Sequence, residues 1–262
     1  MPIGFTKIHV MGNDAILAET FTQRVYDPET LSILLTDRTF GIGGEALLTV
    51  SPADGAEADA SLAVWAADGT HTDPAGFAPF CAAKLLFDHR IVSSDTASVA
   101  TGEGIFRFRQ TVPDRRGVSL ICGSFPRPKA AEPVTEGGLI LHRVGDLTVL
   151  RTDESFPDCT GIGEINIAAV ATALGALPGR KGEPFLIAEA GAGRTARAKL
   201  WIPGRGDVRI RLNAICAAAE LLADCAPLTV SMTGGDARAE LRDGTVEVTL
   251  PVTAVFDGMT VI

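Results

Sequence analysis

Short runs in which hydrophobic and polar residues alternate dominate this chain, and such runs are typical of half-buried β-strands. They predict strands at residues 5–10, 16–19, 46–50, 60–66, 98–101, 104–110, 185–190 and 197–202, with further strands between 119 and 150. Two segments, 78–89 and 212–224, place their apolar residues at helical spacing instead. A third helix is predicted between Asp27 and Arg38, with Pro28 in its first turn. The pattern therefore predicts an α+β fold rich in strands.

Polar segments that contain glycine or proline predict where the chain turns. Residues 113–117 are expected to link two halves of the chain. The dipeptides Asp243-Gly244 and Asp257-Gly258 are typical of hairpin turns and predict two of them near the C-terminus. We therefore expect an N-terminal half over residues 1–115, a C-terminal half over 116–253, and a strand over 254–262 that returns to the N-terminal half.

The two halves repeat one another. The two tryptophans of the chain, Trp65 and Trp201, lie 136 residues apart, and the same offset relates Leu85 to Leu221. In each half an apolar strand that ends in Trp leads into a helix rich in Ala and Leu. We therefore expect two pseudo-symmetric halves, each a mostly antiparallel sheet wrapped around one central helix, with a cleft between the halves.

Such a cleft has a predicted ligand. If the halves are related by a pseudo-two-fold axis, the N-termini of both central helices face it and offer unpaired N–H groups and partial positive charge, which suit a carboxylate. The alternative is that the repeat records folding history alone and the cleft binds nothing.

Composition narrows the possible partners and compartments. The 262 residues carry a net charge of −9, which disfavours nucleic acid and anionic membranes as partners. No apolar run approaches the roughly 20 residues that cross a bilayer, and residues 1–6 lack the features of a signal peptide, so a cytoplasmic protein is expected. The five cysteines include no C-x-x-C pair and predict reduced thiols without a metal. The glycine-rich stretches at 41–44 and 191–193 fit neither a dinucleotide nor a phosphate loop, so no cofactor is predicted.

Three N-terminal motifs resemble a known family. Residues 5–14 (FTKIHVMGND), 37–43 (DRTFGIG) and 67–70 (ADGT) are similar to the N-terminal half of diaminopimelate epimerase, and the resemblance continues to Phe256-Asp257-Gly258. It implies two pseudo-symmetric α/β halves, catalysis without a cofactor, and a cysteine at the N-terminus of each central helix as a proton-abstracting and proton-donating pair. A homodimer is also consistent with the resemblance.

This sequence departs from the family at both catalytic cysteines. Ala75 and Arg211 stand at the two positions that match them, and neither side chain can abstract a proton at neutral pH. Cys81 and Cys216 lie about five residues further along and are expected to be buried packing residues. We therefore do not expect a two-thiol epimerase.

The substrate contacts that the resemblance implies are also mostly replaced. The family's Glu-Arg pair falls on Ile202-Pro203, while Asn13 and Asn166 keep the expected amides. The stretch from Asp73 to Gly76 is similar to one in the phenazine-biosynthesis isomerases, which share the duplicated fold without the two cysteines. Their histidine after Ala-Gly is Phe77 here. Asn13, Asp73, Gly76 and Asn166 are expected to bind substrate.

Other polar residues are expected to act as the acid/base groups of the reaction. Glu45, directly after the loop at 41–44, lies near the position of the glutamate that those isomerases use as acid/base, so it is the first catalytic candidate. The alternative is a solvated carboxylate, or one that caps the glycine loop. His71 and Asp207 share the offset of 136 and are further candidates, unless they are exposed loop residues too far apart to interact.

Arg211 opposes the dipole of its helix and predicts an anionic ligand or an internal partner such as Asp207. Asn213 is expected to contact the same ligand.

Two functions remain open. The first is a divergent, cofactor-independent enzyme that transfers a proton on a small anionic carboxylate by isomerisation, lyase chemistry or cyclisation, which fits a role in specialised metabolism. The second is a catalytically inactive homologue that binds an anionic metabolite or a protein partner.

Overall fold

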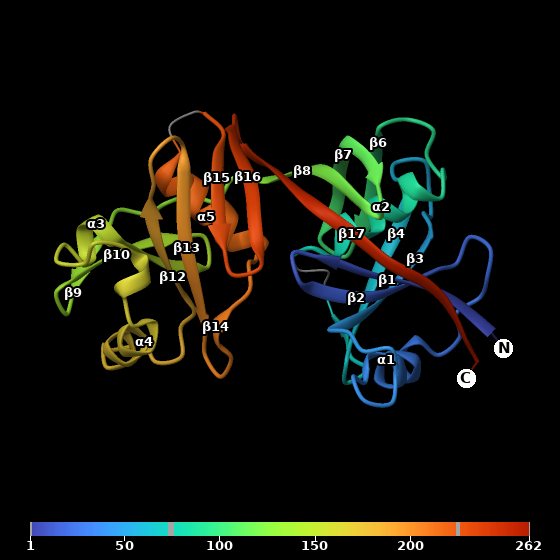
Figure 1. Cartoon of the computed structure of the whole chain (residues 1–262), viewed down its shortest axis with the longest axis horizontal. Helices are drawn as coiled ribbons and strands as arrows, with labels where there is room; N and C mark the ends of the chain where they lie inside the picture. Colours follow the sequence, from blue (N-terminus) through green and yellow to red (C-terminus); the bar gives the residue numbers. More distant parts are fainter. Residues whose placement is uncertain (1, 73–75, 224–225, 262) are drawn as a thin grey trace. The chain divides into compact units, whose positions relative to one another are not determined.

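A computed structural model describes residues 2–72, 76–223 and 226–261, which form two compact units (Figure 1). The first unit comprises Met1–Ser124 and Thr249–Ile262, and the second comprises Phe125–Val248. These boundaries lie at 124/125 and 248/249, whereas the sequence predicted 115/116 and 253/254. The strands that begin at Val118 and Thr245 each continue across a boundary between units.

The strands of the first unit close into a ring. They are β1 (Pro2–Val10), β2 (Asn13–Glu19), β3 (Ala46–Pro52), β4 (Ala60–Ala66), β5 (His71–Thr72), β6 (Thr96–Thr101), β7 (Gly104–Arg115), β8 (Val118–Pro126) and β17 (Thr245–Val261). All except β5 pair in the circular order β1, β2, β3, β4, β6, β7, β8, β17 and back to β1. A closed ring leaves few backbone groups unpaired.

Helix α2 (Ala78–Asp88) is largely buried, with every residue from Pro79 to Leu86 in the interior of this unit. It contacts six of the eight ring strands, namely β1, β2, β3, β4, β6 and β7. Phe80 and Leu86 are fully buried, and so is the charged Lys84. The Lys84 ammonium lies 2.8 Å from Asp88, 2.7 Å from Asp114 and 3.1 Å from the Ser119 hydroxyl, so its three N–H donors have three partners.

Helix α1 (Pro28–Thr36) agrees with the predicted helix. The Asp27 side chain accepts a hydrogen bond from the Thr30 N–H at 3.2 Å and caps the first turn, with Pro28 at the position where its missing N–H costs nothing. Leu31 and Leu35 pack on Ile3, Ile16 and Leu47 of the adjacent sheet. The helix thus fixes where the glycine loop at 41–44 begins.

The second unit contains eight further strands and three helices among its described residues. The strands are β9 (Val134–Glu136), β10 (Leu139–Val144), β11 (Leu147–Arg151), β12 (Phe185–Ala190), β13 (Thr195–Ile202), β14 (Gly206–Val208), β15 (Leu228–Met232) and β16 (Gly235–Arg242). The helices are α3 (Thr152–Ser155), α4 (Ile167–Gly175) and α5 (Leu212–Leu222), with a 3-10 turn at Ile162–Glu164. Leu150, Phe185 and Ile187 form a core with Val170 and Leu174 of α4.

The strand pairings reproduce the duplication predicted from the tryptophans. In both units a parallel pair (β2–β3, β11–β12) is followed by an antiparallel pair (β3–β4, β12–β13) and a further parallel pair (β4–β6, β13–β15). Trp65 lies opposite His71 on β5, and Trp201 lies opposite Asp207 on β14. In Figure 1, helices α1 and α2 lie with the strands of the first unit, and α3, α4 and α5 lie with those of the second.

Two turn predictions were wrong. Residues 113–117 do not form a linker: β7 runs through Arg115, and Arg115 pairs with Val118 to close a hairpin within the first unit. Asp257-Gly258 lies inside β17, where Gly258 pairs with Phe5. Glycine is needed there for close approach, because a Cβ on Gly258 would come within 2.5 Å of the Phe5 ring.

Candidate functional site

The backbone holds Glu45 at the start of β3. After α1 the glycine loop folds back on the helix: the N–H groups of Ile42 and Gly43 donate to the Leu35 carbonyl at 2.9 and 3.0 Å. The Glu45 N–H donates to the Asp14 carbonyl at 2.9 Å, and its side chain is exposed. These backbone bonds fix the course of the loop that leads into β3.

An ion network supports the same loop. The Asp14 carboxylate receives Lys7 at 2.7 Å and both terminal nitrogens of Arg38, at 2.7 and 3.2 Å, while Lys7 also donates to the Gly43 carbonyl. Burial would raise the pKa of Asp14, but the hydrogen bonds from Arg38 and Lys7 outweigh it and lower that pKa. Asp14 raises the pKa of Arg38, and the nearby charge of Glu45 adds to this effect. The guanidinium thus places positive charge close to Glu45.

Asn13 begins β2 and directly precedes Asp14, the carboxylate of this network. Its Nδ2 donates to the Val10 carbonyl at 3.1 Å, and the residue is half-buried. The turn at Met11-Gly12 therefore holds the amide nitrogen against the Val10 carbonyl.

His71 and Asp207 occupy matching positions in the two units. His71 is exposed, and its ring centroid lies 4.9 Å from that of Trp65 on the neighbouring strand. Asp207 is exposed opposite Trp201. Each is presented on a short two- or three-residue strand beside a tryptophan, so the offset of 136 has a structural meaning.

The segment before α2 holds further predicted residues. Asp73 and Ala75 lie outside the described residues. Gly76 has a φ of 81°, a conformation that favours glycine, and no atom of the described residues lies within 4 Å of the place a Cβ would take. Phe77, which stands where the phenazine-biosynthesis isomerases have histidine, is buried and packs edge-on against Phe80 with ring centroids 6.4 Å apart. A buried aromatic side chain therefore stands where the resemblance predicts a polar one.

Arg211 precedes α5 and retains a buried donor. It stands at the N-cap without a side-chain capping bond, and its Nε is buried with no hydrogen-bond partner among the described residues. Asp207 therefore does not satisfy that nitrogen. Leaving a charge-bearing donor without a partner costs free energy, so this site lacks an acceptor.

The two asparagines of the second unit have identifiable partners. Asn166 caps α4: its Oδ1 accepts the N–H groups of Ala168 and Ala169, both at 3.1 Å. This oxygen therefore caps the helix. Asn is a preferred N-cap residue, so its place directly before an apolar helix could have indicated this role. Asn213 is exposed and donates to Asp146 at 3.4 Å.

The cysteines of the central helices are packing residues, as predicted. Cys81 on α2 and Cys216 on α5 are both buried. Burial raises the pKa of each thiol to about 12. A thiol with that pKa is almost entirely protonated at neutral pH and cannot act as a base.

We expect Cys81 and Cys216 to react with a thiol-specific disulfide reagent at pH 8 at least about 100-fold more slowly in the folded protein than in denaturant. Mass spectrometry of labelled peptides separates them from Cys159, which is half-buried and serves as the internal control. Rapid labelling of Cys81 in the folded state would show that the helix exposes a usable thiolate.

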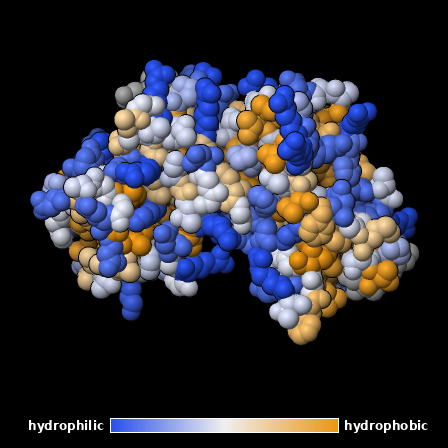
Figure 2. Space-filling view, in the orientation of Figure 1, coloured by the Kyte–Doolittle hydropathy of each residue, from blue (hydrophilic) through white to orange (hydrophobic). Residues whose placement is uncertain are grey.

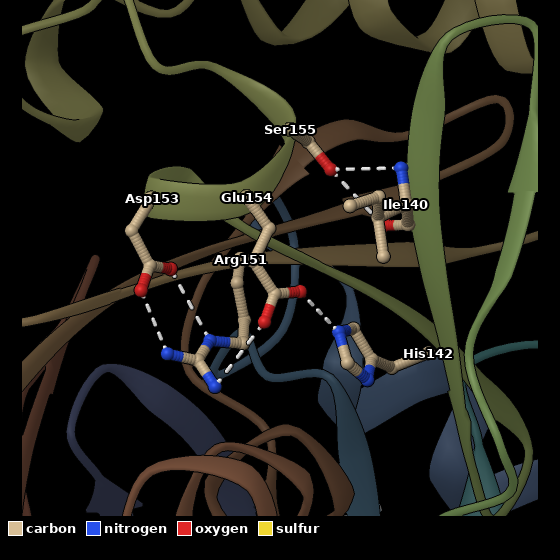
Figure 3. A network of polar contacts seen from close by, with 6 residues as sticks. All are labelled: Ile140, His142, Arg151, Asp153, Glu154 and Ser155. Atoms are coloured by element: carbon tan, nitrogen blue, oxygen red, sulfur yellow. Dashed lines mark hydrogen bonds and ion pairs between the residues drawn. The ribbon is translucent and has the colours of Figure 1, made fainter.

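A second polar network lies in the other unit (Figure 3). The buried His142 bonds to Glu154 of α3 at 2.5 Å, and Arg151 joins Glu154 at 3.4 Å and Asp153 at 2.7 Å. The bond from Arg151 lowers the pKa of Asp153. His142 also lines a cavity of about 330 Å³ with Thr148 and other residues. This group was not predicted from the sequence, because no motif connects His142 to Glu154.

The chain resembles diaminopimelate epimerases in sequence. It is 32% identical over 151 residues to the enzyme of Agathobacter rectalis, covering 58% of this chain and 48% of that protein. It is 25% identical over 279 residues to the enzyme of Methanococcus maripaludis strain C5, covering 97% and 98%. The first match thus spans about half of its relative and the second nearly all. No family model matches the chain.

Solved structures share the fold at lower sequence identity. A phenazine biosynthesis protein of the PhzF family from Enterococcus faecalis superimposes with a TM-score of 0.68 at 13% identity, covering all of both chains. A hydroxyproline epimerase from Agrobacterium vitis gives 0.61 at 13% identity, covering 98% of this chain and 92% of that one. A methylitaconate-delta-isomerase gives 0.66 at 12%, covering 99% and 95%. The fold is therefore shared across epimerases and isomerases.

Membrane spans and metal clusters are both absent from the described residues. No helix there is long and apolar enough to cross a membrane. Nor does that part of the chain contain a group of three or more His, Cys, Asp or Glu side chains that could hold a metal ion.

Proposed function

We propose that this chain, a homologue of the diaminopimelate epimerases, is a cofactor-independent enzyme that transfers a proton on a small carboxylate, with Glu45 as the acid/base group. The single observation that carries this proposal is the position of Glu45, directly after the glycine loop, with its N–H bonded to the Asp14 carbonyl and the Arg38 guanidinium nearby. Relatives and structural neighbours named as epimerases and isomerases support the reaction class.

A carboxylate suits this protein better than a thiol. Burial raises the pKa of Cys81 and of Cys216 to about 12, which removes both as bases. A glutamate carboxylate can accept a proton from carbon next to the substrate's carboxylate and return it elsewhere on the substrate. Isomerisation, lyase chemistry and cyclisation share that first proton transfer. His71 and Asp207 are proposed as further acid/base groups because both are exposed beside the duplicated pattern of paired strands.

We propose that Arg211 binds the carboxylate of the substrate. Its buried Nε has no partner among the described residues, and α5 begins directly after it without a side-chain cap. A carboxylate there would accept a hydrogen bond from this Nε and further hydrogen bonds from the N–H groups in the first turn of α5. Asn213 is proposed to contact the same carboxylate from that first turn.

The same Arg211 site also supports the second candidate function, an inactive homologue that binds an anionic metabolite. A binding protein needs the acceptor for Arg211 but not the proton transfer by Glu45. The two functions therefore differ in whether bound carboxylates exchange hydrogen with solvent.

Hydrogen exchange in D2O tests the proposal. With a panel of small carboxylates, we expect mass spectrometry to show solvent deuterium on carbon in at least one compound, and Glu45→Gln to slow this uptake about 100-fold or more. Glu57→Gln, at an exposed site of the same unit, is the matched control and should leave the rate unchanged.

Arg211→Ala separates the two functions. Loss of carboxylate binding without any exchange in the unmodified protein would favour the binding protein over the enzyme. Exchange that persists in Glu45→Gln would exclude Glu45 as the base.

A further inference from the structure

The cavity beside His142 in the second unit has a buried floor and an exposed rim. Its volume is about 330 Å³, within the range of roughly 300–1,000 Å³ that small-molecule sites occupy. Leu141, His142 and Thr148 form the buried floor, and Glu132 and Arg143 belong to the exposed rim. Figure 2 shows hydrophilic and hydrophobic residues side by side on the surface of this unit. The cavity shares no lining residue with the groups proposed for proton transfer and carboxylate binding, so a ligand here would have a separate role.

His142 has one ring nitrogen that the protein does not use. Its Nε2 lies 2.5 Å from a Glu154 oxygen, and Figure 3 shows that Glu154 also meets Arg151. When Nε2 donates its proton to this carboxylate, Nδ1 is a hydrogen-bond acceptor. Among the residues that the structure describes, no group donates to Nδ1. Because His142 lines the cavity, the floor offers an acceptor to a ligand that carries an N–H donor.

Arg180 also lines the cavity, but the protein balances its charge. Its Nε and Nη2 donate to the two oxygens of Glu136 at 2.7 and 2.9 Å, and its Nη1 donates to Glu183 at 3.2 Å. Glu183 also accepts from the Thr148 hydroxyl at 3.3 Å, which ties the floor to the same group. Arginine held by two carboxylates in this way forms a fixed wall. It is therefore not the group that anchors a charged ligand.

Arg143 and Glu132 carry charges on the rim that the protein leaves largely unpaired. The Arg143 Nε donates to the Gly145 carbonyl at 3.2 Å, while its Nη1 comes only within 3.8 Å of Glu183. Glu132 makes no hydrogen bond or ion pair with any part of the chain that the structure describes. The Ala131 N–H donates to the Arg143 carbonyl at 2.8 Å, so the two rim segments are adjacent. The rim therefore presents one positive and one negative group that do not bind each other.

We propose that this cavity binds a free α-amino acid with an apolar side chain. The carboxylate of the ligand bonds to the terminal nitrogens of Arg143, a pairing that guanidinium geometry favours. Its ammonium group bonds to Glu132 and donates to Nδ1 of His142. Its side chain packs on Val134 and Leu141, the large apolar residues of the lining. A ligand with a single charge would leave one of the two rim groups without a partner.

Isothermal titration calorimetry with three related compounds tests the ligand class. L-leucine carries both charges, 4-methylpentanoate lacks the amino group, and 3-methylbutylamine lacks the carboxylate. We expect L-leucine to bind at least about tenfold more tightly than either of the other two, because only L-leucine pairs with both rim groups. Equal affinity for L-leucine and 4-methylpentanoate would contradict the zwitterionic ligand.

Two rim variants assign the binding to this cavity. Arg143→Ala and Glu132→Gln should each weaken L-leucine binding about tenfold, because each removes one of the two charge pairings. The matched control is Arg238→Ala, which removes an exposed arginine of the same unit outside the cavity and should keep the original affinity. Thermal unfolding verifies that each variant is folded.

Two results would overturn the proposal. One is the absence of binding by L-leucine, L-methionine and L-phenylalanine at about 10 mM. The other is an L-leucine affinity that a folded Arg143→Ala protein retains in full. Arg211→Ala separates this cavity from the carboxylate site of the proposed function, because it should leave the affinity for L-leucine unchanged. A loss confined to Arg211→Ala would place the amino acid at that other site instead.

Discussion

Replacing Lys84 with Met is expected to lower the free energy of unfolding by about 3 kcal/mol. The side chain is fully buried on α2, and its ammonium lies within 2.8 Å of both Asp88 and Asp114. Methionine fills a similar volume but leaves two carboxylates without their cation. Because both carboxylates retain partial exposure, solvent limits the loss to the lower part of the range for broken buried ion pairs. Denaturant unfolding followed by circular dichroism measures it.

The difference between Lys84→Met and the original protein should shrink in acid. The bond from Lys84 lowers the pKa of Asp114, so its stabilising effect is present above the ordinary pKa of aspartate and is lost as pH falls through the lowered value. Burial raises the pKa of Asp88 despite Lys84, so that group becomes neutral earlier on acidification. Lys181→Met, at an exposed site, is the control. Equal stability of the two variants at neutral pH would contradict a structural role for the buried amine.

Gly41→Ala is expected to cost about 3 kcal/mol and to displace the loop that carries Glu45. A Cβ at this position would clash with the Leu34 carbonyl oxygen and lie 2.7 Å from that of Leu35. These are backbone atoms of the last turn of α1, so no side chain can move aside. The loop must instead leave the helix and lose bonds such as that from Ile42 to Leu35.

Thermal unfolding measures the cost of Gly41→Ala, and the D2O assay reports the position of Glu45. Gly163→Ala is the matched control and should be nearly neutral, because no atom lies within 4 Å of the place its new methyl group would take. If a folded Gly41→Ala protein took up deuterium at the original rate, the catalytic role of Glu45 would be contradicted.

Several features of the candidate site followed from local patterns. The glycine loop after α1 and the strand that begins directly after Glu45 were predicted because a helix stop and a strand start are encoded within a few residues. Burial of Cys81 and Cys216 followed from their place inside helices with apolar residues all around. The amide of Asn166 shows what local patterns do not determine. The sequence predicted a contact with substrate, whereas in the structure its oxygen caps α4.

The sequence by itself determined the duplication, because a tryptophan strand and an Ala/Leu helix recur at one offset and hydrophobic periodicity is a local property. Only the tertiary structure decided that Asp257-Gly258 continues a strand, since the decisive contact comes from Phe5 at the other end of the chain. It likewise decided that Lys84 meets Asp114 and that Arg211 keeps a buried donor with no partner among the described residues. Such pairings depend on which distant segments the fold brings together, and no short-range pattern encodes them.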